Sequence, residues 1–454
     1  MNSKDRICKL LDEKASYFTD IADKIWAKPE LGYKEYYAAQ LLMDALRENG
    51  FEVETELAGI KTAFKGTFGS GKPVIGFMAE YDALAGLSQE AGCTERKEVE
   101  EGGHGHGCGH NAMGPACLAA VVALKERMEA EQLGGTIVFY GCPAEEQGCG
   151  KSFMTREGVF DDLDAAFAWH ACQYNYITED SLLANIQAEF SFTGLSAHAA
   201  MCPELGRSAL DAAELMNVGV NFMREHVSSA ARIHYAFLDV GGTSPNVVQN
   251  SAKLLYYIRS PKSSEVREMY ARIVDIAKGA ALMTGTTSSH VIRSAMCEFV
   301  PNAVLGELTQ ECWEEIGPCK YSDESIALAE KMQKSLGVTG DKPALVNNMP
   351  KPYKLDPGCT PGSNDLGDVS YVTPVSFIFM TGVSADTPYH SWNFTAQTGS
   401  SITREALIHG GKVMAYAGYK LLKNPELAEK AKAELKATGV VYECLIPKEV
   451  QPTQ

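Results

Sequence analysis

The sequence predicts an α/β fold in which a domain with a mostly parallel sheet carries an inserted α+β domain. Apolar runs with little alternation lie at 73–79, 135–140, 164–169 and 375–380, and helix-type patterns separate them. Such strands are typical of parallel sheets that are covered on both faces. At residue 186 the apolar period changes to two, and apolar α/β character returns after residue 301. We therefore expect a first domain formed by 1–185 together with 302–454, and an inserted domain at 186–301.

The individual elements follow from apolar spacing. Helical spacing covers 4–27 and 34–49, with Gly50 as a C-terminal cap, and it returns at 111–132 and 402–421. Short strands are expected at 51–60 and 62–68. The inserted domain is expected to hold strands at 186–193, 251–259 and 291–300 and helices at 207–224 and 264–284, and a charged helix is expected at 424–437.

Composition excludes several classes of partner. The chain has 454 residues, of which 58 are acidic and 41 basic, so its net charge is −17. This charge argues against nucleic acid or an anionic membrane as partner, although local cations can still bind an anionic substrate. The 13 cysteines show no framework spacing, and we find no signal-peptide pattern and no apolar run long enough to span a membrane. We expect a reduced, cytoplasmic protein.

The segment His-Gly-His-Gly-Cys-Gly-His at 104–110 concentrates metal-ligand chemistry. Three of the chain's ten histidines and one cysteine lie within seven residues, between a strand-like and a helix-like run. Imidazole and thiolate are ligands that zinc prefers. The alternative is a flexible polar loop.

Four segments with acidic or imidazole side chains each follow a predicted strand, and the first of them leads by a long loop to residues 104–110. They are Glu80-Tyr81-Asp82, Glu145-Glu146, His170 and His390. Because ligands of an open α/β sheet bind outside the carboxyl ends of its strands, we expect these segments to meet. Taken singly, adjacent glutamates are usually a solvated helix start, and a lone histidine after an apolar strand is usually a core residue.

The predicted metal ligands are Cys108, His110, Glu146, His170 and His390. Five protein ligands are too many for one catalytic zinc, but they suit two ions that share a ligand and a water, about 3.5 to 4 Å apart. Glu145 is then free to act as the general base. We expect His104 and His106 to support the ligands rather than to bind the ions directly, because a third imidazole ligand from the same short loop would strain that loop.

The chain resembles the amidohydrolase branch of the dinuclear-metal aminoacylase and carboxypeptidase superfamily. The resemblance covers nearly the whole chain in order. It is carried by KPELGYKEY (28–36), AEYDALAGLSQEAG (79–92), GHGCGHNAMG (105–114), PAEEQGCGK (143–151), FTGLSAHAAMCPELGRSALDA (192–212), SPNVV (244–248), SNDLGDVSYVTP (363–374) and HSW (390–392).

The resemblance implies the same five ligands for two divalent ions, zinc or manganese, with Cys108 in place of a bridging aspartate and Glu145 as base. It also implies that the inserted domain acts as a lid and forms a homodimer. In that domain His198 would polarise the scissile carbonyl, often from the partner subunit, and Asn246 would lie near the substrate carboxylate. Arg259 is a candidate cation for the same carboxylate. His198 as a helix cap and Asn246 as a turn residue remain the alternatives.

The expected activity is hydrolysis of an amide between an acyl or aroyl group and an amino acid or short peptide with a free carboxylate. One alternative is a dipeptidase or carboxypeptidase that acts on unmodified peptides. The other is a non-catalytic partner in a two-subunit hydrolase, so a sister subunit is a second expected partner. Asn364, where threonine is usual beside Asp365, and Ala85, where proline is usual, depart from the family pattern.

Overall fold

Seven strands form the central sheet of the computed structural model, which describes residues 2–338 and 342–452. The order is β1-β2-β4-β3-β5-β13-β6, and the neighbours β4, β3, β5 and β13 are parallel. β1, β2 and β6 pair antiparallel at the two edges. The prediction of a mostly parallel sheet is therefore confirmed for the centre of the sheet. The strands are β1 (Glu52–Thr55), β2 (Phe64–Ser70), β3 (Val74–Ala79), β4 (Gly135–Gly141), β5 (Ala165–Cys172), β6 (Tyr176–Ile177) and β13 (Val375–Thr381).

Helices bury both faces of this sheet. Phe77 of β3 packs into one apolar cluster and its neighbour Met78 into the other, so successive residues of the strand are both buried. This double burial explains why the strands lack polar alternation. The first cluster contains α1 (Ser3–Glu13), α2 (Ala15–Ala27), α3 (Tyr36–Glu48), α4 (His110–Glu131), α9 (Ala303–Ile316), α13 (Ser401–Lys423) and α14 (Pro425–Ala437), and the second contains α6 (Gly150–Arg156) and α11 (Leu366–Val372).

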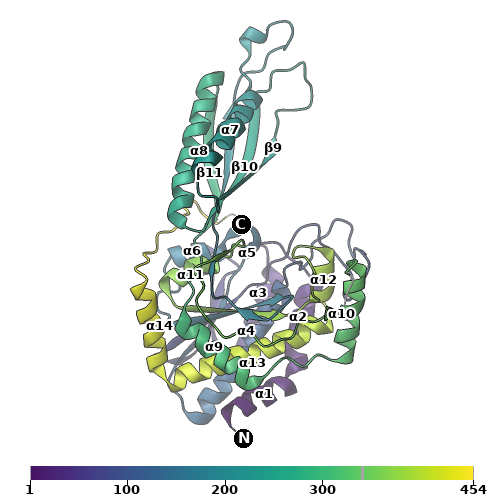
Figure 1. Cartoon of the computed structure of the whole chain (residues 1–454), viewed down its shortest axis with the longest axis vertical. Coiled ribbons are helices and arrows are strands. Elements are labelled where there is room, and N and C mark those ends of the chain that lie inside the picture. Colours follow the sequence, from purple (N-terminus) through teal and green to yellow (C-terminus); the bar gives the residue numbers. More distant parts are fainter. Residues whose placement is uncertain (1, 339–341, 453–454) are drawn as a thin grey trace.

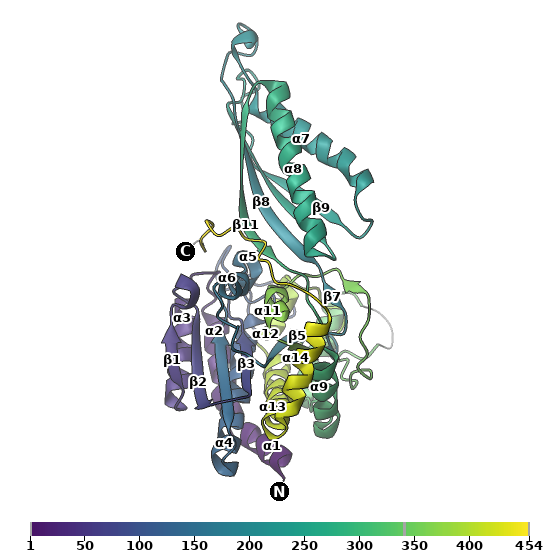
Figure 2. The same ribbon diagram turned by 90° about the vertical axis from the view of Figure 1, so that its left-hand side faces the viewer.

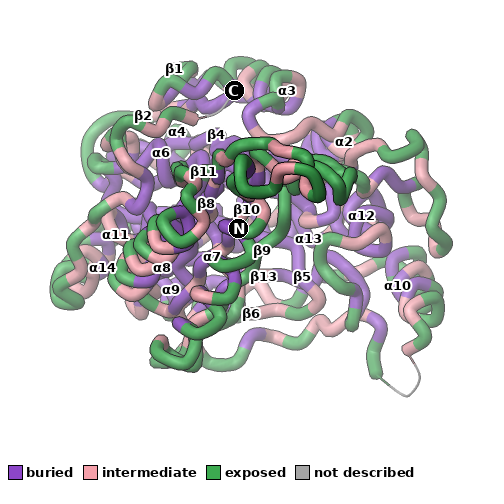
Figure 3. The backbone as a smooth tube through the Cα atoms, turned by 90° about the horizontal axis from the view of Figure 1, so that it is seen from above, coloured by how far each residue is buried: buried purple, intermediate pink, exposed green. Residues whose placement is uncertain are grey.

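Residues 184–296 form a separate unit that projects from one end of the part built on the seven-stranded sheet, which we call the base (Figures 1 and 2). We call it the projecting unit. Its sheet has the antiparallel order β11-β8-β10-β9, and two helices pack on one face. Seen from above, its outer loops are exposed, whereas the chain beneath it is largely buried (Figure 3). Its elements are β8 (Ala184–Thr193), α7 (Ala209–Met223), β9 (Arg232–Asp239), β10 (Ser251–Ser260), α8 (Ser263–Thr284) and β11 (Thr287–Met296).

Several boundaries differ from those expected. The single helix expected at 4–27 is two helices that meet at Lys14; both contact α4 and α13, but α1 packs mainly on α13 and α2 mainly on α4. The strand expected at 291–300 is β11, which ends at Met296, since the N–H of Cys297 donates to Asp368 in the base. β9 was missed because most of its residues are exposed and show no alternation in burial.

The remaining helices are α5 (Glu145–Gly148), α10 (Asp323–Ser335) and α12 (Trp392–Thr398), and the short strands β7 (Ser181–Leu182) and β12 (Cys359–Thr360) form a parallel pair. Among the helices of the described residues, none is both long and apolar enough to cross a bilayer.

Candidate metal centre

The four segments expected at strand ends meet at one edge of the sheet. Their strands, β4, β3, β5 and β13, are adjacent and parallel, so their carboxyl ends lie side by side. Glu80 follows β3 directly, Glu145 begins α5 after β4, and His390 lies in the loop after β13. His170 lies within β5 itself rather than beyond it, because the strand continues to Cys172.

Glycines and one backbone contact shape the loop that carries Cys108 and His110. Gly109 has a φ of 88°, a left-handed conformation that lets the chain turn between the two ligand candidates and begin α4 at His110. The N–H of His390 donates to the carbonyl of Gly107 at 3.0 Å. This bond ties the loop after β13 to the loop before α4.

A second set of contacts fixes the turn that presents Glu145 and Glu146. Ala144 adopts a left-handed φ of 59°, and its N–H donates to the Glu35 carboxylate at 2.8 Å. The hydroxyl of Tyr33 donates to the carbonyl of Gly148 at 2.6 Å. Tyr33 and Glu35 therefore hold the backbone of this turn in place, a role that the sequence alone did not reveal.

The predicted ligand atoms form two overlapping groups. The ligand atoms of Cys108, His110 and His170 lie within 4.8 Å of one another, as do those of Cys108, Glu146 and His390. Cys108 Sγ is 3.4 Å from His170 Nε2, and His390 Nε2 is 3.4 Å from Glu146 Oε2. Two groups that share Cys108 are an arrangement that can hold two ions with a common ligand.

Buried polar atoms without partners support a fit to metal ions. Among the described residues, His110 Nε2, Glu146 Oε1 and Glu80 Oε2 are buried and form no hydrogen bond. Such atoms are rare in folded proteins, because each would otherwise lose its water without compensation. Bound cations would satisfy all three. A thiolate, imidazoles and carboxylates form a donor set that suits zinc, and the oxygen and nitrogen donors also suit manganese.

The electrostatics of this cluster arise from burial and from mutual charge. Burial raises the pKa of Cys108 well above its ordinary value and lowers the pKa of His170 to about 4. Burial alone would lower the pKa of His110, but Cys108, Glu80 and Asp82 raise it well above its ordinary value. Burial, followed by repulsion from Glu80 and Glu146, raises the pKa of Glu145 well above that of an exposed carboxyl. Such a carboxyl is suited to take up and return a proton.

Asp82 is a site residue to which the sequence analysis gave no individual role. Its Oδ1 lies 2.9 Å from His110 Nδ1, and its Oδ2 accepts the backbone N–H of Glu146 at 3.0 Å. A carboxylate on the far nitrogen of a metal-binding histidine fixes the orientation of the ring. The signal in the sequence was its place two residues after Glu80 at the end of a buried strand.

A cavity of about 360 Å³, large enough for a small-molecule substrate, is lined by Cys108, Glu145, Glu146, His170 and His390. Arg259 reaches it from β10, and its Nε is buried without a hydrogen-bond partner in the described chain. The ring of Phe379 stacks on His170 at 5.4 Å, and Tyr176 stacks on Phe379 at 4.4 Å. The lining also includes Leu182, Tyr257, Met296, Phe377 and Tyr389.

The structure does not bring His198 and Asn246 to this cavity. His198 lies in the loop after β8 and Asn246 in the loop between β9 and β10, and both loops leave the sheet at the end where Thr193 pairs with Ser251. There they are neighbours, since the N–H of Ala199 donates to the carbonyl of Asn246 at 2.9 Å. The exposed ring of His198 accepts the N–H of Met201 through Nδ1 at 3.1 Å. Within one chain, Arg259 is the predicted substrate residue that lies at the candidate centre.

Comparison with known proteins identifies the class. A model of the peptidase family M20/M25/M40 matches residues 76–440, and the chain belongs to this family. It is therefore an amide-bond hydrolase of the metallopeptidase type, and it binds divalent metal ions.

Individual relatives cover nearly the whole chain. One of the subunits of p-aminobenzoyl-glutamate hydrolase from Escherichia coli is 41% identical over 96% of this chain and 96% of its own length. The Xaa-Arg dipeptidase of Mus musculus is 27% identical over 95% of this chain and 92% of its own length. A solved dinuclear metal-binding peptidase of the M20 family from Bacillus subtilis shares the fold, with a TM-score of 0.61 and 18% identity over 91% of this chain and 99% of that chain.

Proposed function

We propose that the chain hydrolyses the amide bond between an acyl or aroyl group and an amino acid that keeps a free carboxylate. The observation that carries the proposal is one cavity lined by Glu145, by the cation Arg259 and by every metal-ligand candidate except His110, which lies behind Cys108 and His170. The 41% identity to a protein of the p-aminobenzoyl-glutamate hydrolase of Escherichia coli supports this substrate class.

The side chains divide the reaction among them. Cys108, His110, Glu146, His170 and His390 hold two divalent ions, zinc or manganese, which supply Lewis-acid chemistry when bound. Glu145 takes a proton from the attacking water and passes it to the leaving nitrogen. Its burial and its raised pKa support this double role.

Two features of the cavity support the choice of substrate. Arg259 is held over the ring of Tyr257, at 5.1 Å from its centroid, and offers hydrogen-bond donors to a carboxylate. The stacked rings of Tyr176 and Phe379 give the cavity an aromatic side that favours a planar aroyl group.

We further propose that residues 186–301 form a lid and dimerisation domain. β9 is an edge strand with the exposed side chains Tyr235, Phe237 and Leu238, and such an edge favours pairing with a second copy. Because His198 and Asn246 lie at the outer end of the projecting unit, they act on the cavity of the partner subunit in this proposal. His198 then stabilises the oxyanion, and Asn246 lies beside the substrate carboxylate.

Two alternatives keep specific support. The 27% identity to a Xaa-Arg dipeptidase supports hydrolysis of unmodified dipeptides. The relative that is 41% identical is one of the subunits of its enzyme, which supports a sister subunit for this chain as well.

We also propose a reducing cytoplasmic location, which the 13 unpaired cysteines of the described chain support.

Substrate profiling of the purified, metal-loaded chain tests the proposal. We expect a higher kcat/KM for p-aminobenzoyl-glutamate and benzoyl-glycine than for dipeptides, and little turnover of the α-carboxamides of the same substrates. A higher kcat/KM for dipeptides would favour the alternative that the chain is a dipeptidase. Turnover that appears only after a sister subunit is added would favour the non-catalytic partner.

A further inference from the structure

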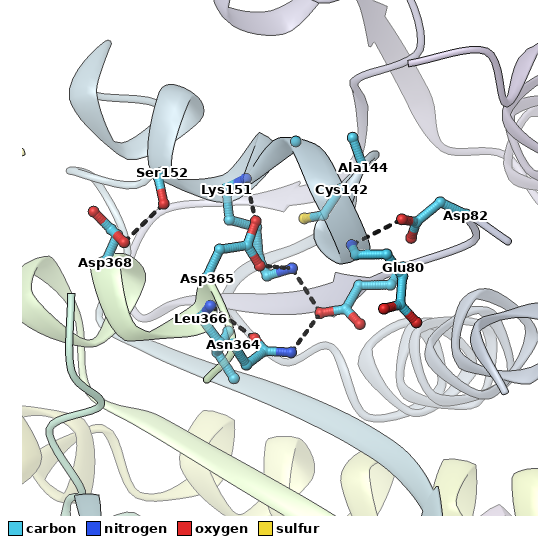
Figure 4. Close-up of polar contacts among 12 residues, drawn as sticks. Glu80, Asp82, Cys142, Ala144, Lys151, Ser152, Asn364, Asp365, Leu366 and Asp368 are labelled. Carbon is cyan, nitrogen blue, oxygen red and sulfur yellow. Dashed lines mark hydrogen bonds and ion pairs between the residues drawn. The ribbon is translucent and has the colours of Figure 1, made fainter. Parts of the chain in front are cut away.

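A fully buried lysine lies beside the candidate centre and has no part in the reaction described above. The side chain of Lys151 is 0% exposed, and its Nζ lies 2.6 Å from Glu80 Oε1 and 2.5 Å from Asp365 Oδ1. The backbone N–H of Lys151 also donates to Asp365 Oδ2 at 2.8 Å. Figure 4 shows Lys151 of α6 between Glu80, at the end of β3, and Asp365, just before α11.

The two oxygens of Glu80 have different surroundings. Oε1 faces Lys151 and also lies 3.4 Å from the side-chain nitrogen of Asn364, as Figure 4 shows. Oε2 has no hydrogen-bond partner among the described residues and lies 3.2 Å from His110 Nε2. Two atoms at this separation can both bind one ion at bond lengths of about 2.1 Å.

Charge within this pocket also points to a cation. Glu80 and Asp365 are both buried and carry two formal negative charges, whereas Lys151 supplies one positive charge. Glu80 Oε2 faces His110 Nε2 at 3.2 Å, and this nitrogen has no proton to donate once it binds an ion, so the buried oxygen then requires the ion itself as its positive partner. Oε2 lies on the side of Glu80 that faces His110, with Glu145 also within 4.8 Å.

We propose that Glu80 supplies Oε2 as a further ligand to the ion held by His110 and His170. In this account Lys151, anchored by Asp365, is a positioning residue: it engages Oε1 and so keeps Oε2 turned toward His110. The inference rests on the metal centre of the proposed function but assigns residues outside its five ligands. Asn364, which departs from the family pattern, assists by approaching the same oxygen as Lys151.

The competing explanation is that Lys151 merely joins helices in the core, and Ser152 provides a matched control for it. Ser152 is the next residue of α6, is equally buried, and donates to Asp368 Oδ2 of α11 at 2.8 Å. Figure 4 shows this contact on the far side of Lys151 from Glu80. Its loss removes a buried polar link between the same parts of the chain without touching Glu80.

Metal affinity of the full chain, measured by competition with a chromophoric chelator for Zn²⁺ and for Mn²⁺, tests the inference without any substrate. We expect Glu80→Gln, which removes the charge of a ligand, and Lys151→Met, which removes the group that positions it, each to weaken binding of one of the two ions by about 10- to 100-fold. The second ion, held by Cys108, Glu146 and His390, should bind as in the wild type. Ser152→Ala should bind both ions as the wild type does.

The double variant Glu80→Gln/Lys151→Met should be no worse than Glu80→Gln alone, because Lys151 acts through Glu80. Independent, additive losses would overturn the positioning role, as would wild-type affinity for both ions in folded Glu80→Gln protein. If Lys151→Met does not fold, Glu80→Gln, which keeps the shape of the side chain, still decides whether Glu80 is a ligand. If the proposed function is wrong, the wild-type chain will not hydrolyse the substrate, but the differences in metal affinity among these variants will remain. The two proposals can therefore fail separately.

Discussion

Asp82 accepts a hydrogen bond from Nδ1 of His110 at 2.9 Å and so leaves Nε2 as the ring nitrogen that faces the candidate metal centre. The second oxygen of the same carboxylate accepts the backbone N–H of Glu146. One buried side chain at the end of β3 thereby orients ligand candidates on two other segments.

Replacement of Asp82 by asparagine should weaken metal binding. The amide would place a donor against either the His110 ring or the Glu146 N–H, so one of the two contacts is lost. Loss of such a supporting contact costs about 10- to 100-fold in metal affinity. Chelator competition on folded protein measures it, with Asp44→Asn on the exposed face of α3 as the matched control. Equal affinities in both variants would remove the orienting role.

Arg259→Met should raise KM for substrates with a free carboxylate by about 10- to 100-fold, since a hydrogen bond between charged groups is lost. The effect on kcat should be smaller, because the guanidinium contacts a part of the substrate that does not react. Steady-state kinetics with an acid and its methyl ester would separate these effects. Arg232→Met on the neighbouring strand is the control. A KM increase that is equally large for the ester would argue against carboxylate recognition.

Mixing two inactive variants tests the proposed action of His198 across a dimer. Glu145→Gln should lose about two to four orders of magnitude in rate while it keeps its metals. His198→Ala should lose about two to three orders through the missing oxyanion donor. After subunit exchange, hybrid dimers contain one cavity with both wild-type residues, so part of the activity should return. Absence of recovery after verified exchange would exclude action from the partner.

His409 should make the stability of the metal-free chain depend on pH. Burial lowers the pKa of His409 to about 4, and its Nε2 lies 3.0 Å from the carbonyl of Gly317. Between its ordinary pKa of about 6.5 and this value the unfolded chain binds more protons than the folded chain, so the free energy of unfolding falls as the pH falls. His409→Gln should reduce that fall by up to about 3 kcal/mol at pH 4. Denaturant titrations at pH 7 and pH 4 would reveal it, and identical pH dependence in both proteins would contradict it.

The fold class and the convergence of the strand ends were predictable, because they follow from local patterns. Strands that are buried on both faces read as continuous apolar runs. Residues that directly follow adjacent parallel strands lie at the same edge of the sheet, independent of the loop conformations. By contrast, the contact between Glu35 and Ala144 joins residues far apart in sequence, and no local pattern encodes it. Lys151 was missed for the same reason, since both carboxylates that surround it come from distant segments.

The positions of His198 and Asn246 show a second limit of sequence-based prediction. Their motifs predicted substrate contacts, but a motif does not say where the fold places its residues. The outward direction of β8 separates them from the cavity of their own chain. The missed strand β9 has a different cause, since most of its residues are exposed and show no alternation in burial.

Removal and return of metal, followed by the rate of p-aminobenzoyl-glutamate hydrolysis, test the central claim most directly. The purified chain, with no other subunit present, should release p-aminobenzoate, lose that activity when a chelator removes its metals, and regain it when Zn²⁺ or Mn²⁺ returns. Protein that binds two ions per chain yet hydrolyses neither this substrate nor any other N-acyl amino acid would contradict the account.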